Sequence, residues 1–198
     1  EQRLEALRDP IWRLFHLYRI INKDGESVPF QPKIAQQQVI EAVYIRGERK
    51  ILILKARQQG FSTLISIILL DGTVWEDNQQ AAIVDQTQDD ACLKLGKCKY
   101  ALEGFAEIEE LKDILNNVER NNDSTLVLSN ESWIKAGKNA RGGTHNRIHI
   151  SEWGPIAYSD PKRSREIKTG ALPSAEKGLI FVESTFKGNK CGDFYDLI

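Results

Sequence analysis

The sequence is poor in the residues that cross-link small proteins or bind zinc. It has three histidines and three cysteines, Cys92, Cys98 and Cys191, which lack CxxC spacing. We therefore expect neither a disulfide framework nor a zinc site, and the cysteine content predicts a reducing, cytosolic setting. Methionine is absent, which leads us to expect that residue 1 lies inside a longer chain.

Long apolar runs and an excess of one charge are also lacking. The longest apolar run, Leu64 to Leu70, is interrupted by Ser66 and is far shorter than the roughly 20 residues of a membrane-spanning helix. No signal peptide is recognisable, so we expect no membrane partner. Lys and Arg number 27 against 28 Asp and Glu, a net charge of −1. Any contact with DNA must therefore come from a local basic patch.

The length and composition of the chain are typical of a globular domain. The chain has 198 residues, of which 41% are hydrophobic and 28% charged, which excludes a disordered tail, a disulfide-rich miniprotein and a coiled-coil rod. We expect one main domain, residues 31–198, preceded by an N-terminal helical segment or lid, residues 1–30.

Apolar runs that predict buried strands alternate with segments that predict helices. This alternation predicts an α/β fold with a mainly parallel central sheet flanked by helices. The predicted strands are 51–54, 81–84, 148–150 and 179–182, with a hairpin at 125–129 and 132–136. The predicted helices are 11–21, 32–47, 62–75, one capped by Thr87 and Asp90, and one that begins at Asp160-Pro161 and ends before Pro173.

Polar clusters follow three of these strands, at 55–63, 151–152 and 183–185. In open parallel sheets, ligands bind at the carboxyl ends of the strands. We therefore examine these three clusters as parts of one candidate site.

The first cluster, KARQQGFST (55–63), lies between a strand and an apolar helix, which is the position of a phosphate-binding loop. Against the pattern GxxxxGK[ST], Lys55 takes the place of the first Gly, Gly60 matches the second, and Phe61 replaces the usual Lys. Ser62 matches the hydroxyl that binds Mg²⁺. The residues expected to contact the nucleotide are Lys55, Arg57, Gln58, Gln59, Gly60, Phe61, Ser62 and Thr63.

A phosphate-binding loop needs a cation against the β- and γ-phosphates, and only Lys55 and Arg57 stand in this loop. We favour Lys55, because the side chain of a strand-end residue can fold back over the loop, but Arg57 stays open. The alternative interpretation of the segment is an ordinary strand–turn–helix with a solvated Lys-Arg pair.

The second cluster ends the apolar strand RIHISE (147–152), as in a Walker B motif. Glu152 can polarise the water that attacks a phosphoanhydride. Ser151 stands where an Asp usually binds Mg²⁺. Its hydroxyl can hold a metal-bound water but adds no charge, so a lower Mg²⁺ affinity is expected. The alternative is a strand-end Glu without a role.

The third cluster is Glu183-Ser184-Thr185. The hydroxyls of Ser184 and Thr185 could hydrogen-bond the γ-phosphate or the attacking water and report hydrolysis to moving parts. A plain cap or turn is the alternative interpretation.

Together, the ordered motifs RQQGFST, SEWGP and ESTFKG resemble the ATPase domain of large terminase subunits, the DNA-packaging motors of tailed bacteriophages, and the resemblance covers residues from about 30 to 188. The resemblance implies a P-loop NTPase fold of the ASCE type, with ATP and Mg²⁺ as ligands. The family includes members with Lys at the start of the Walker A motif and an aromatic residue later, as Lys55 and Phe61 stand here. Ser in place of the first Walker B acid, as at Ser151, also occurs in it.

The resemblance implies further site residues. Gln36 matches the family's adenine-recognising glutamine, with Gln37 and Gln38 as alternatives in register, or all three are solvated. Arg141 matches an arginine finger delivered across a subunit interface, with Arg147 as the rival, or either is a surface charge. Ser184 and Thr185 match the coupling motif.

The resemblance also implies a function: ATP hydrolysis that powers translocation of double-stranded DNA into a procapsid in the host cytoplasm. The implied partners are the portal protein, the small terminase subunit and further copies in a ring, with a monomer expected in isolation. Because the chain stops at Ile198, we expect an ATPase domain without nuclease activity, and the degenerate motifs predict slow hydrolysis by the isolated domain.

Other interpretations remain open at this level. The fold would also suit a helicase-like ATPase, or an assembly module that binds ATP without hydrolysing it. The basic run Lys162, Arg163, Arg165 and Lys168 either tracks DNA phosphates or forms a solvated face. Trp153 is expected to pack in the core.

Overall fold

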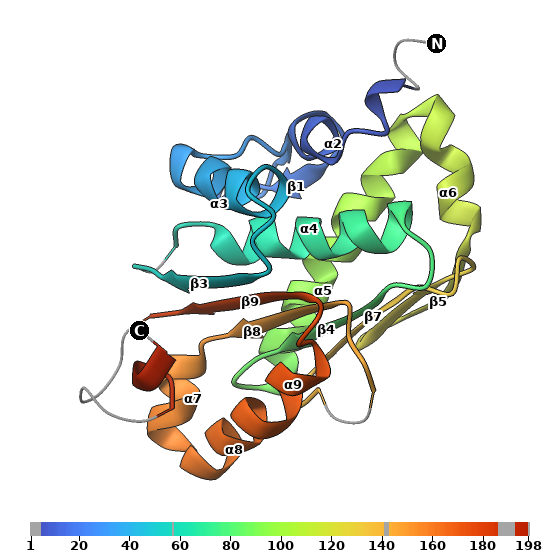
Figure 1. Ribbon diagram of the computed structural model, residues 1–198. Helices are drawn as coiled ribbons and strands as arrows, with labels where there is room; N and C mark the ends of the chain where they lie inside the picture. Colours follow the sequence, from blue (N-terminus) through green and yellow to red (C-terminus); the bar gives the residue numbers. More distant parts are fainter. Residues whose placement is uncertain (1–4, 57, 141–142, 186–192, 198) are drawn as a thin grey trace.

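A seven-stranded sheet forms the centre of the structure, with helices on both of its faces (Figure 1). The structure is a computed structural model that describes residues 5–56, 58–140, 143–185 and 193–197. The strands lie in the order β3 (Lys50–Leu54), β9 (Leu179–Ser184), β8 (Arg147–Ser151), β4 (Gln80–Val84), β7 (Trp133–Gly137), β6 (Thr125–Leu128) and β5 (Val118–Asn122).

The sheet is mainly parallel, as predicted. Strands β3, β9, β8, β4 and β7 pair in parallel, whereas β6 pairs antiparallel with both β7 and β5. The carboxyl ends of β3, β9 and β8 therefore lie side by side at one edge of the molecule, which is the arrangement on which the three polar clusters depend.

One face of the sheet is covered by the helices of the first half of the chain (Figure 1). The central one, α4, is buried from Leu64 to Thr73, because it is apolar on all sides and packs between the sheet and the other helices. Ile53, Ile83 and Phe181 supply the sheet side of this core. The helices are α2 (Pro10–His16), α3 (Ile34–Tyr44), α4 (Phe61–Trp75) and α5 (Gln88–Glu103).

The opposite face is covered by a chain of short helices in the second half (Figure 1). Ile148, Ile150 and Val182 point to this side and pack against Trp153 and Ile167, in the alternation that a strand imposes. These helices are α7 (Trp153–Ser159), α8 (Pro161–Glu166), a π-turn (Ile167–Ala171) and α9 (Leu172–Ser174). The remaining short elements are α6 (Lys112–Asn116) and 3₁₀ turns at Gly104–Glu107, Glu109–Leu111 and Tyr195–Leu197.

The helix predicted for 11–21 is wrong in its second half. Its residues 19–21 form strand β1 (Arg19–Ile21), which pairs with β2 (Ser27–Pro29) in a separate hairpin. The Asn22 side chain accepts hydrogen bonds from the amides of Asp24 and Glu26, at 2.9 Å each, and stabilises the turn. The β-branched residues before this turn then favour a strand over a helix.

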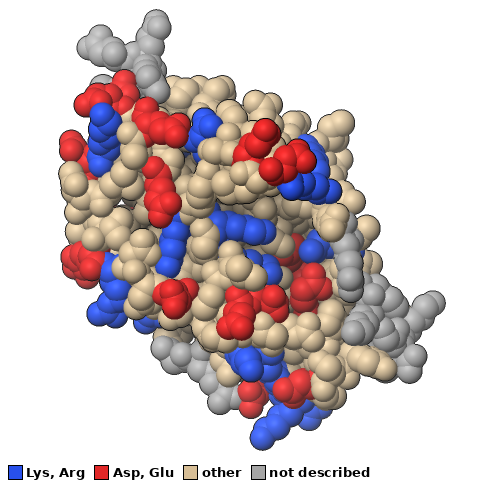
Figure 2. Space-filling view, turned by 180° about the vertical axis from the view of Figure 1, so that it is seen from behind, with Lys and Arg blue, Asp and Glu red and all other residues tan. Residues whose placement is uncertain are grey.

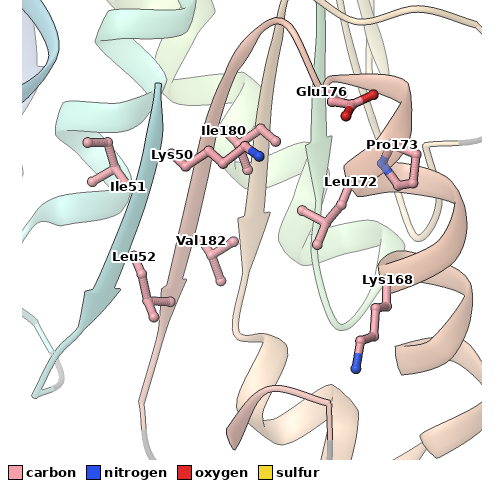
Figure 3. A pocket seen from close by; sticks show the side chains of 9 residues that line it. All are labelled: Lys50, Ile51, Leu52, Lys168, Leu172, Pro173, Glu176, Ile180 and Val182. Atoms are coloured by element: carbon pink, nitrogen blue, oxygen red, sulfur yellow. The ribbon is translucent and has the colours of Figure 1, made fainter. Parts of the chain in front are cut away.

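The strand predicted for 51–54 is present, but the expectation that both its faces are covered is wrong. Because β3 lies at the edge of the sheet, Leu52 and Leu54 are 39% and 52% exposed, whereas Ile51 and Ile53 are buried. Beside Leu52, a groove of about 530 Å³ runs between β3, β9 and α9 (Figure 3), away from the strand tips.

Three further elements differ from expectation in the second half. The helix that begins at Asp160 does not end before Pro173 but continues through a π-turn to Ser174. Pro173 is tolerated because it stands in the first turn of α9, where no amide donor is needed. Neither α7 nor β5 was predicted, because α7 is only 7 residues long and β5 reads VERNN, without apolar alternation.

No helix in the described ranges is both long enough and apolar enough to cross a bilayer.

The N-terminal segment is anchored to α4 by a buried ion pair. Arg13 donates from Nε and Nη2 to the two carboxylate oxygens of Asp71, at 2.8 and 2.7 Å. The Tyr18 hydroxyl donates to the same carboxylate at 2.7 Å. Burial, together with the Asp71 charge, raises the pKa of Tyr18. The N-terminal residues and α4 therefore form one packed unit.

We expect Asp71→Ala to lower the free energy of unfolding by about 3–5 kcal/mol, because it leaves the buried Arg13 charge without its partner. Urea denaturation followed by tryptophan fluorescence measures this loss. The exposed Asp77, six residues further along, provides the control, and Asp77→Ala should change stability by less than about 0.5 kcal/mol. Equal effects of the two substitutions would contradict the anchoring role.

Candidate functional site

The carboxyl ends of β3, β8 and β9 bring the three polar clusters into contact. Beyond the strand ends, the Lys55 amide donates to the Ser184 carbonyl at 3.0 Å, and the Glu152 amide donates to the Glu183 carbonyl at 2.8 Å. The backbone ladder thus continues into the clusters themselves, so the positions of their side chains are set by the sheet.

The loop before α4 has the backbone geometry of an anion-binding turn. Gly60 caps the helix with φ +78°, a left-handed conformation that favours glycine. The helix begins at Phe61, so Ser62 and Thr63 lie in its first turn, where amide groups have no partner within the helix. Because α4 has 15 residues, this N-terminus offers donors and a positive dipole end to an anion.

Lys55 folds back over the site from the end of β3. Its side chain is 9% exposed, and its ammonium nitrogen lies 3.3 Å from Glu152 Oε1 and 3.4 Å from Glu183 Oε2. Lys55 thus links carboxylates from two neighbouring strands. The rival phosphate contact, Arg57, lies outside the described residues.

Glu183 is the residue that the sequence reasoning missed. Its carboxylate is fully buried, and Oε1 accepts hydrogen bonds from Ser62, from His149 Nε2 at 3.0 Å and from Ser151 Oγ at 3.3 Å. Burial raises the pKa of this carboxyl, but His149, Ser62 and Lys55 together lower it to about 2. Glu183 is therefore ionised at neutral pH.

A signal for Glu183 was available in the strand itself. Phe181 and Glu183 are two residues apart, so they share the face that packs under α4. An acidic residue on the buried face of an apolar strand needs hydrogen-bonding or charged partners. Because Glu183 lies at the end of its strand, those partners were to be sought in the other two polar clusters.

Glu152 is held by the tip of β9. Its Oε2 accepts hydrogen bonds from the Thr185 hydroxyl at 3.0 Å and from the Thr185 amide at 3.4 Å. The residue has φ +53° and ψ +40°, an uncommon conformation for a non-glycine residue that is often found at functional sites. With 26% of its side chain exposed, Glu152 is accessible to a water molecule.

Ser184 connects β9 to the start of α7. Its hydroxyl accepts from the Gly154 amide and donates to the Thr185 carbonyl, both at 2.9 Å. A Cβ on Gly154 would lie 2.7 Å from the Thr185 carbonyl oxygen, so only glycine allows this approach. The two hydroxyls of the third cluster thus contact the second cluster.

Of the three candidate glutamines, Gln36 contacts the phosphate loop. It is buried, donates from Nε2 to the Gly60 carbonyl and accepts at Oε1 from the Lys33 amide, both at 2.8 Å. Gln37 is exposed and donates to the Pro32 carbonyl at 2.8 Å, and Gln38 is exposed. Gln36 therefore ties the start of α3 to the loop.

A cation that the sequence reasoning did not consider also reaches the loop. Lys97, on α5, lies 3.3 Å from the Thr63 hydroxyl. Burial and the neighbouring Lys94 lower the pKa of Lys97. The first turn of α4 therefore has positive side chains on two sides, Lys55 and Lys97.

Of the two arginine-finger candidates, the structure describes Arg147. Arg141 lies outside the described residues. Arg147 begins β8, at the end opposite Glu152, and its guanidinium binds Glu76 at 2.5 Å and the Gln79 side chain. Arg147 is thus directed away from the strand tips that carry the site.

Two of the four basic residues in the run from Lys162 to Lys168 have hydrogen-bond or ion-pair partners. Arg163 donates to the carbonyls of Asp85, Gln86 and Lys138, and Lys168 lies 3.1 Å from Asp193. Lys162 and Arg165 are exposed. On the face that Figure 2 shows, basic and acidic side chains are interspersed.

Trp153 is buried in the core, as expected, and donates to the Ser164 hydroxyl at 2.9 Å. Within the described ranges, no three or more His, Cys, Asp or Glu side chains are grouped closely enough to form a metal site by themselves. A metal at the strand tips would therefore need, besides any single carboxylate, ligands such as hydroxyls, water or phosphate oxygens.

Solved structures with this fold include bacteriophage large terminases. The HK97 bacteriophage large terminase matches 96% of this chain and 39% of its own, with 21% identity and a TM-score of 0.71. The large terminase ATPase domain of Thermus phage P74-26 matches 84% of this chain and 68% of its own, with 18% identity and a TM-score of 0.59. No family model and no curated protein sequence matches.

These likenesses show the fold. The chain has the fold of phage large terminase ATPase domains, which confirms the predicted α/β architecture with its mainly parallel sheet and the resemblance to this family in fold. The chain spans 39% of the HK97 protein, so the activities and partners of a whole terminase do not follow from the fold.

We expect Gln36→Ala to lower the free energy of unfolding by about 1–3 kcal/mol, because the Gly60 carbonyl and the Lys33 amide lose their partner. Thermal or urea denaturation measures this loss. The exposed Gln38 on the same helix is the matched control, and Gln38→Ala should leave stability nearly unchanged. If Gln36→Ala behaves like Gln38→Ala, the link between α3 and the loop contributes no stability.

Proposed function

We propose that this chain binds ATP with Mg²⁺ at the tips of β3, β8 and β9 and hydrolyses it to ADP and phosphate. One arrangement carries this proposal: the Lys55 ammonium lies within 3.4 Å of the carboxylates of Glu152 and Glu183, beside the N-terminus of α4. A cation, a water-accessible carboxylate and a helix N-terminus are the groups that phosphoanhydride hydrolysis uses.

In this proposal the phosphates bind against the first turn of α4. The loop amides between Gln58 and Thr63 donate to phosphate oxygens, and Lys55 supplies the charge that Phe61 does not carry. Lys55 exchanges its carboxylate partners for phosphate oxygens as the nucleotide binds. The contacts of the Lys55 ammonium with Glu152 and Glu183, at 3.3 and 3.4 Å, support Lys55 as this cation, with Arg57 as the alternative.

The hydroxyl and carboxylate oxygens at the strand tips fit Mg²⁺, which prefers oxygen ligands and retains several waters. Ser62 would hold the ion directly and Ser151 through water. When bound, Mg²⁺ neutralises charge on the β- and γ-phosphates.

Glu152 acts as the general base. Its Oε2 is held by Thr185, so Oε1 is available once Lys55 turns to the phosphates. Oε1 takes a proton from the water whose oxygen bonds to the γ-phosphorus, while the bond from that phosphorus to the leaving oxygen of ADP breaks. Because Thr185 is hydrogen-bonded to Glu152, a change in the charge of Glu152 alters the contacts at the tip of β9. This link supports a coupling role for Ser184 and Thr185.

We extend the proposal to a DNA-packaging motor. The fold shared with phage large terminases supports ATP-driven translocation of double-stranded DNA by a ring of copies on a portal protein, with a small subunit, in the host cytoplasm. A neighbouring copy would deliver Arg141, since Arg147 is held by Glu76. Lys162 and Arg165 are the exposed cations available for DNA phosphates. Adenine recognition by Gln36 would require its side chain to exchange its present partners.

A nucleotide-gated assembly module is the second candidate. It is favoured by the neutralisation of Lys55 by two carboxylates, which a nucleotide must displace before catalysis. Phosphate release by the full-length protein, assembled with DNA, separates the two functions, since an assembly module binds ATP without releasing phosphate.

We expect Glu152→Gln to reduce phosphate release by about 10²- to 10⁴-fold, the usual contribution of a general base. Affinity for an ATP analogue, measured by calorimetry, should stay within a few fold of the wild type. Glu176→Gln, an exposed glutamate at the far side of the fold, is the control for the loss of one charge. Loss of analogue binding together with hydrolysis, in a folded variant, would count against Glu152 as the base.

We expect Lys55→Met to weaken ATP binding by about 10- to 150-fold, because a hydrogen bond to a charged group contributes about 1.5–3 kcal/mol. Lys50→Met removes the same charge from the opposite, exposed end of β3 and should leave affinity unchanged. Circular dichroism checks that both variants fold. Unchanged affinity in a folded Lys55→Met protein would transfer the phosphate contact to Arg57.

A further inference from the structure

We propose that Glu183 supplies the metal-binding carboxylate that this chain lacks at position 151, so that the acid of the Mg²⁺ site has moved to the neighbouring strand. This inference rests on the proposed function, and it concerns which side chains hold the ion. Glu183 would act directly or through a metal-bound water, together with Ser62.

The register of the sheet places the two positions next to each other. Ser151 on β8 is the direct partner of Glu183 on β9. Adjacent strands lie about 4.8 Å apart, and residues paired in register point to the same face. The hydrogen bond from Ser151 Oγ to Glu183 Oε1, at 3.3 Å, shows that the two side chains meet. Since Glu is one methylene longer than Asp, the Glu183 carboxylate can extend from β9 to the Ser151 side chain at the end of β8.

The same carboxylate is in contact with the hydroxyl expected to ligate Mg²⁺. Ser62 donates its hydroxyl hydrogen to Glu183 Oε1. Carboxylate and hydroxyl thus come together from β9 and the first turn of α4, on the side where the phosphates would bind. This pairing is the one that Mg²⁺ requires, because the ion is held by one or two protein oxygens together with phosphate oxygens and waters.

The second oxygen of Glu183 lacks a hydrogen-bond donor. Oε2 is buried and accepts no hydrogen bond within the described part of the chain, and its nearest charged neighbour is Lys55 Nζ, at 3.4 Å. A buried carboxylate oxygen without a hydrogen bond is costly, and Lys55 is the cation that offsets this cost here. A metal ion would take over that role if Lys55 turned to the phosphates.

His149 fixes the orientation of the carboxylate. Its Nε2 lies 3.0 Å from Glu183 Oε1, and the imidazole is fully buried. Because an ionised carboxylate only accepts, Nε2 carries the proton of this hydrogen bond. Such a partner behind a metal ligand commonly sets the direction of its free lone pairs.

A role for Glu183 as a mere counter-ion of Lys55 explains less. When a nucleotide draws Lys55 to its phosphates, the buried Glu183 charge loses its cation. A metal ion that arrives with the nucleotide replaces that cation and leaves no buried charge uncompensated. The counter-ion role would leave Glu183 with its hydrogen bonds from Ser62, His149 and Ser151 but without a cation in the nucleotide-bound state.

The test measures metal binding directly, using Mn²⁺ as a spectroscopic substitute for Mg²⁺ and the full-length protein with ADP. Electron paramagnetic resonance gives the free Mn²⁺ concentration. We expect Glu183→Gln to weaken Mn²⁺ affinity in the presence of ADP by about 10- to 100-fold. Affinity for ADP in EDTA should not fall, because no metal is bound there.

The double variant Ser151→Asp with Glu183→Ser moves the acid back to β8 and keeps the net charge of the site. We expect it to recover most of the Mn²⁺ affinity. It also keeps a partner for Lys55, so it serves where Glu183→Gln does not fold. Glu176→Gln is the control for charge.

The outcomes separate the inference from the proposed function. If the wild-type protein binds no Mn²⁺ with ADP, the proposed function is wrong. If it binds Mn²⁺ but folded Glu183→Gln binds it equally well, or if the double variant does not recover affinity, the inference about Glu183 is overturned while the proposed function stands.

Discussion

The balance of charge around Lys55 is the constraint on which the candidate site depends. One ammonium group lies between two carboxylates, one from the turn after β8 and one from the end of β9. Two acids so close together would repel each other without it, and Glu183 has no exposure to water that could screen its charge. The same ion pairs link the residue after β3 to the ends of β8 and β9. The contacts that compensate the charges therefore also position Lys55, the residue proposed to bind phosphate.

Helix α4 connects this arrangement to the rest of the molecule. Its N-terminus forms the loop site, its middle is buried on all sides, and Asp71 near its end binds the N-terminal segment through Arg13 and Tyr18. Alternation along the strands then divides the sheet. On β9, odd positions such as Phe181 and Glu183 face α4, and even positions such as Ile180 and Val182 face the short helices of the second half. Glu183 therefore lies on the α4 face, where it meets Ser62 from the first turn of that helix.

The fold followed from the sequence where local patterns were strong. Ile148 and Ile150 mark a buried strand, and the Thr87–Asp90 cap marks the start of α5, because apolar periodicity and capping are local properties. Patterns failed where pairing decided the conformation. Residues 19–21 continue a helical pattern, but the turn at Asn22 allows them to pair with β2. Leu52 belongs to an apolar run, yet it is 39% exposed because it lies on the edge strand beside an open groove.

The amino-acid sequence by itself determined the alternation of the main strands and helices, the polar residues at the three strand tips and the glycine at the loop. These depend on neighbours within a few positions along the chain. The tertiary structure alone decided that Glu183 meets Ser62, Ser151 and His149, that Gln36 rather than Gln37 or Gln38 touches the loop, and that Arg147 points to the opposite end of the sheet. Strand order and register bring together residues more than 100 positions apart, and no local pattern carries that information.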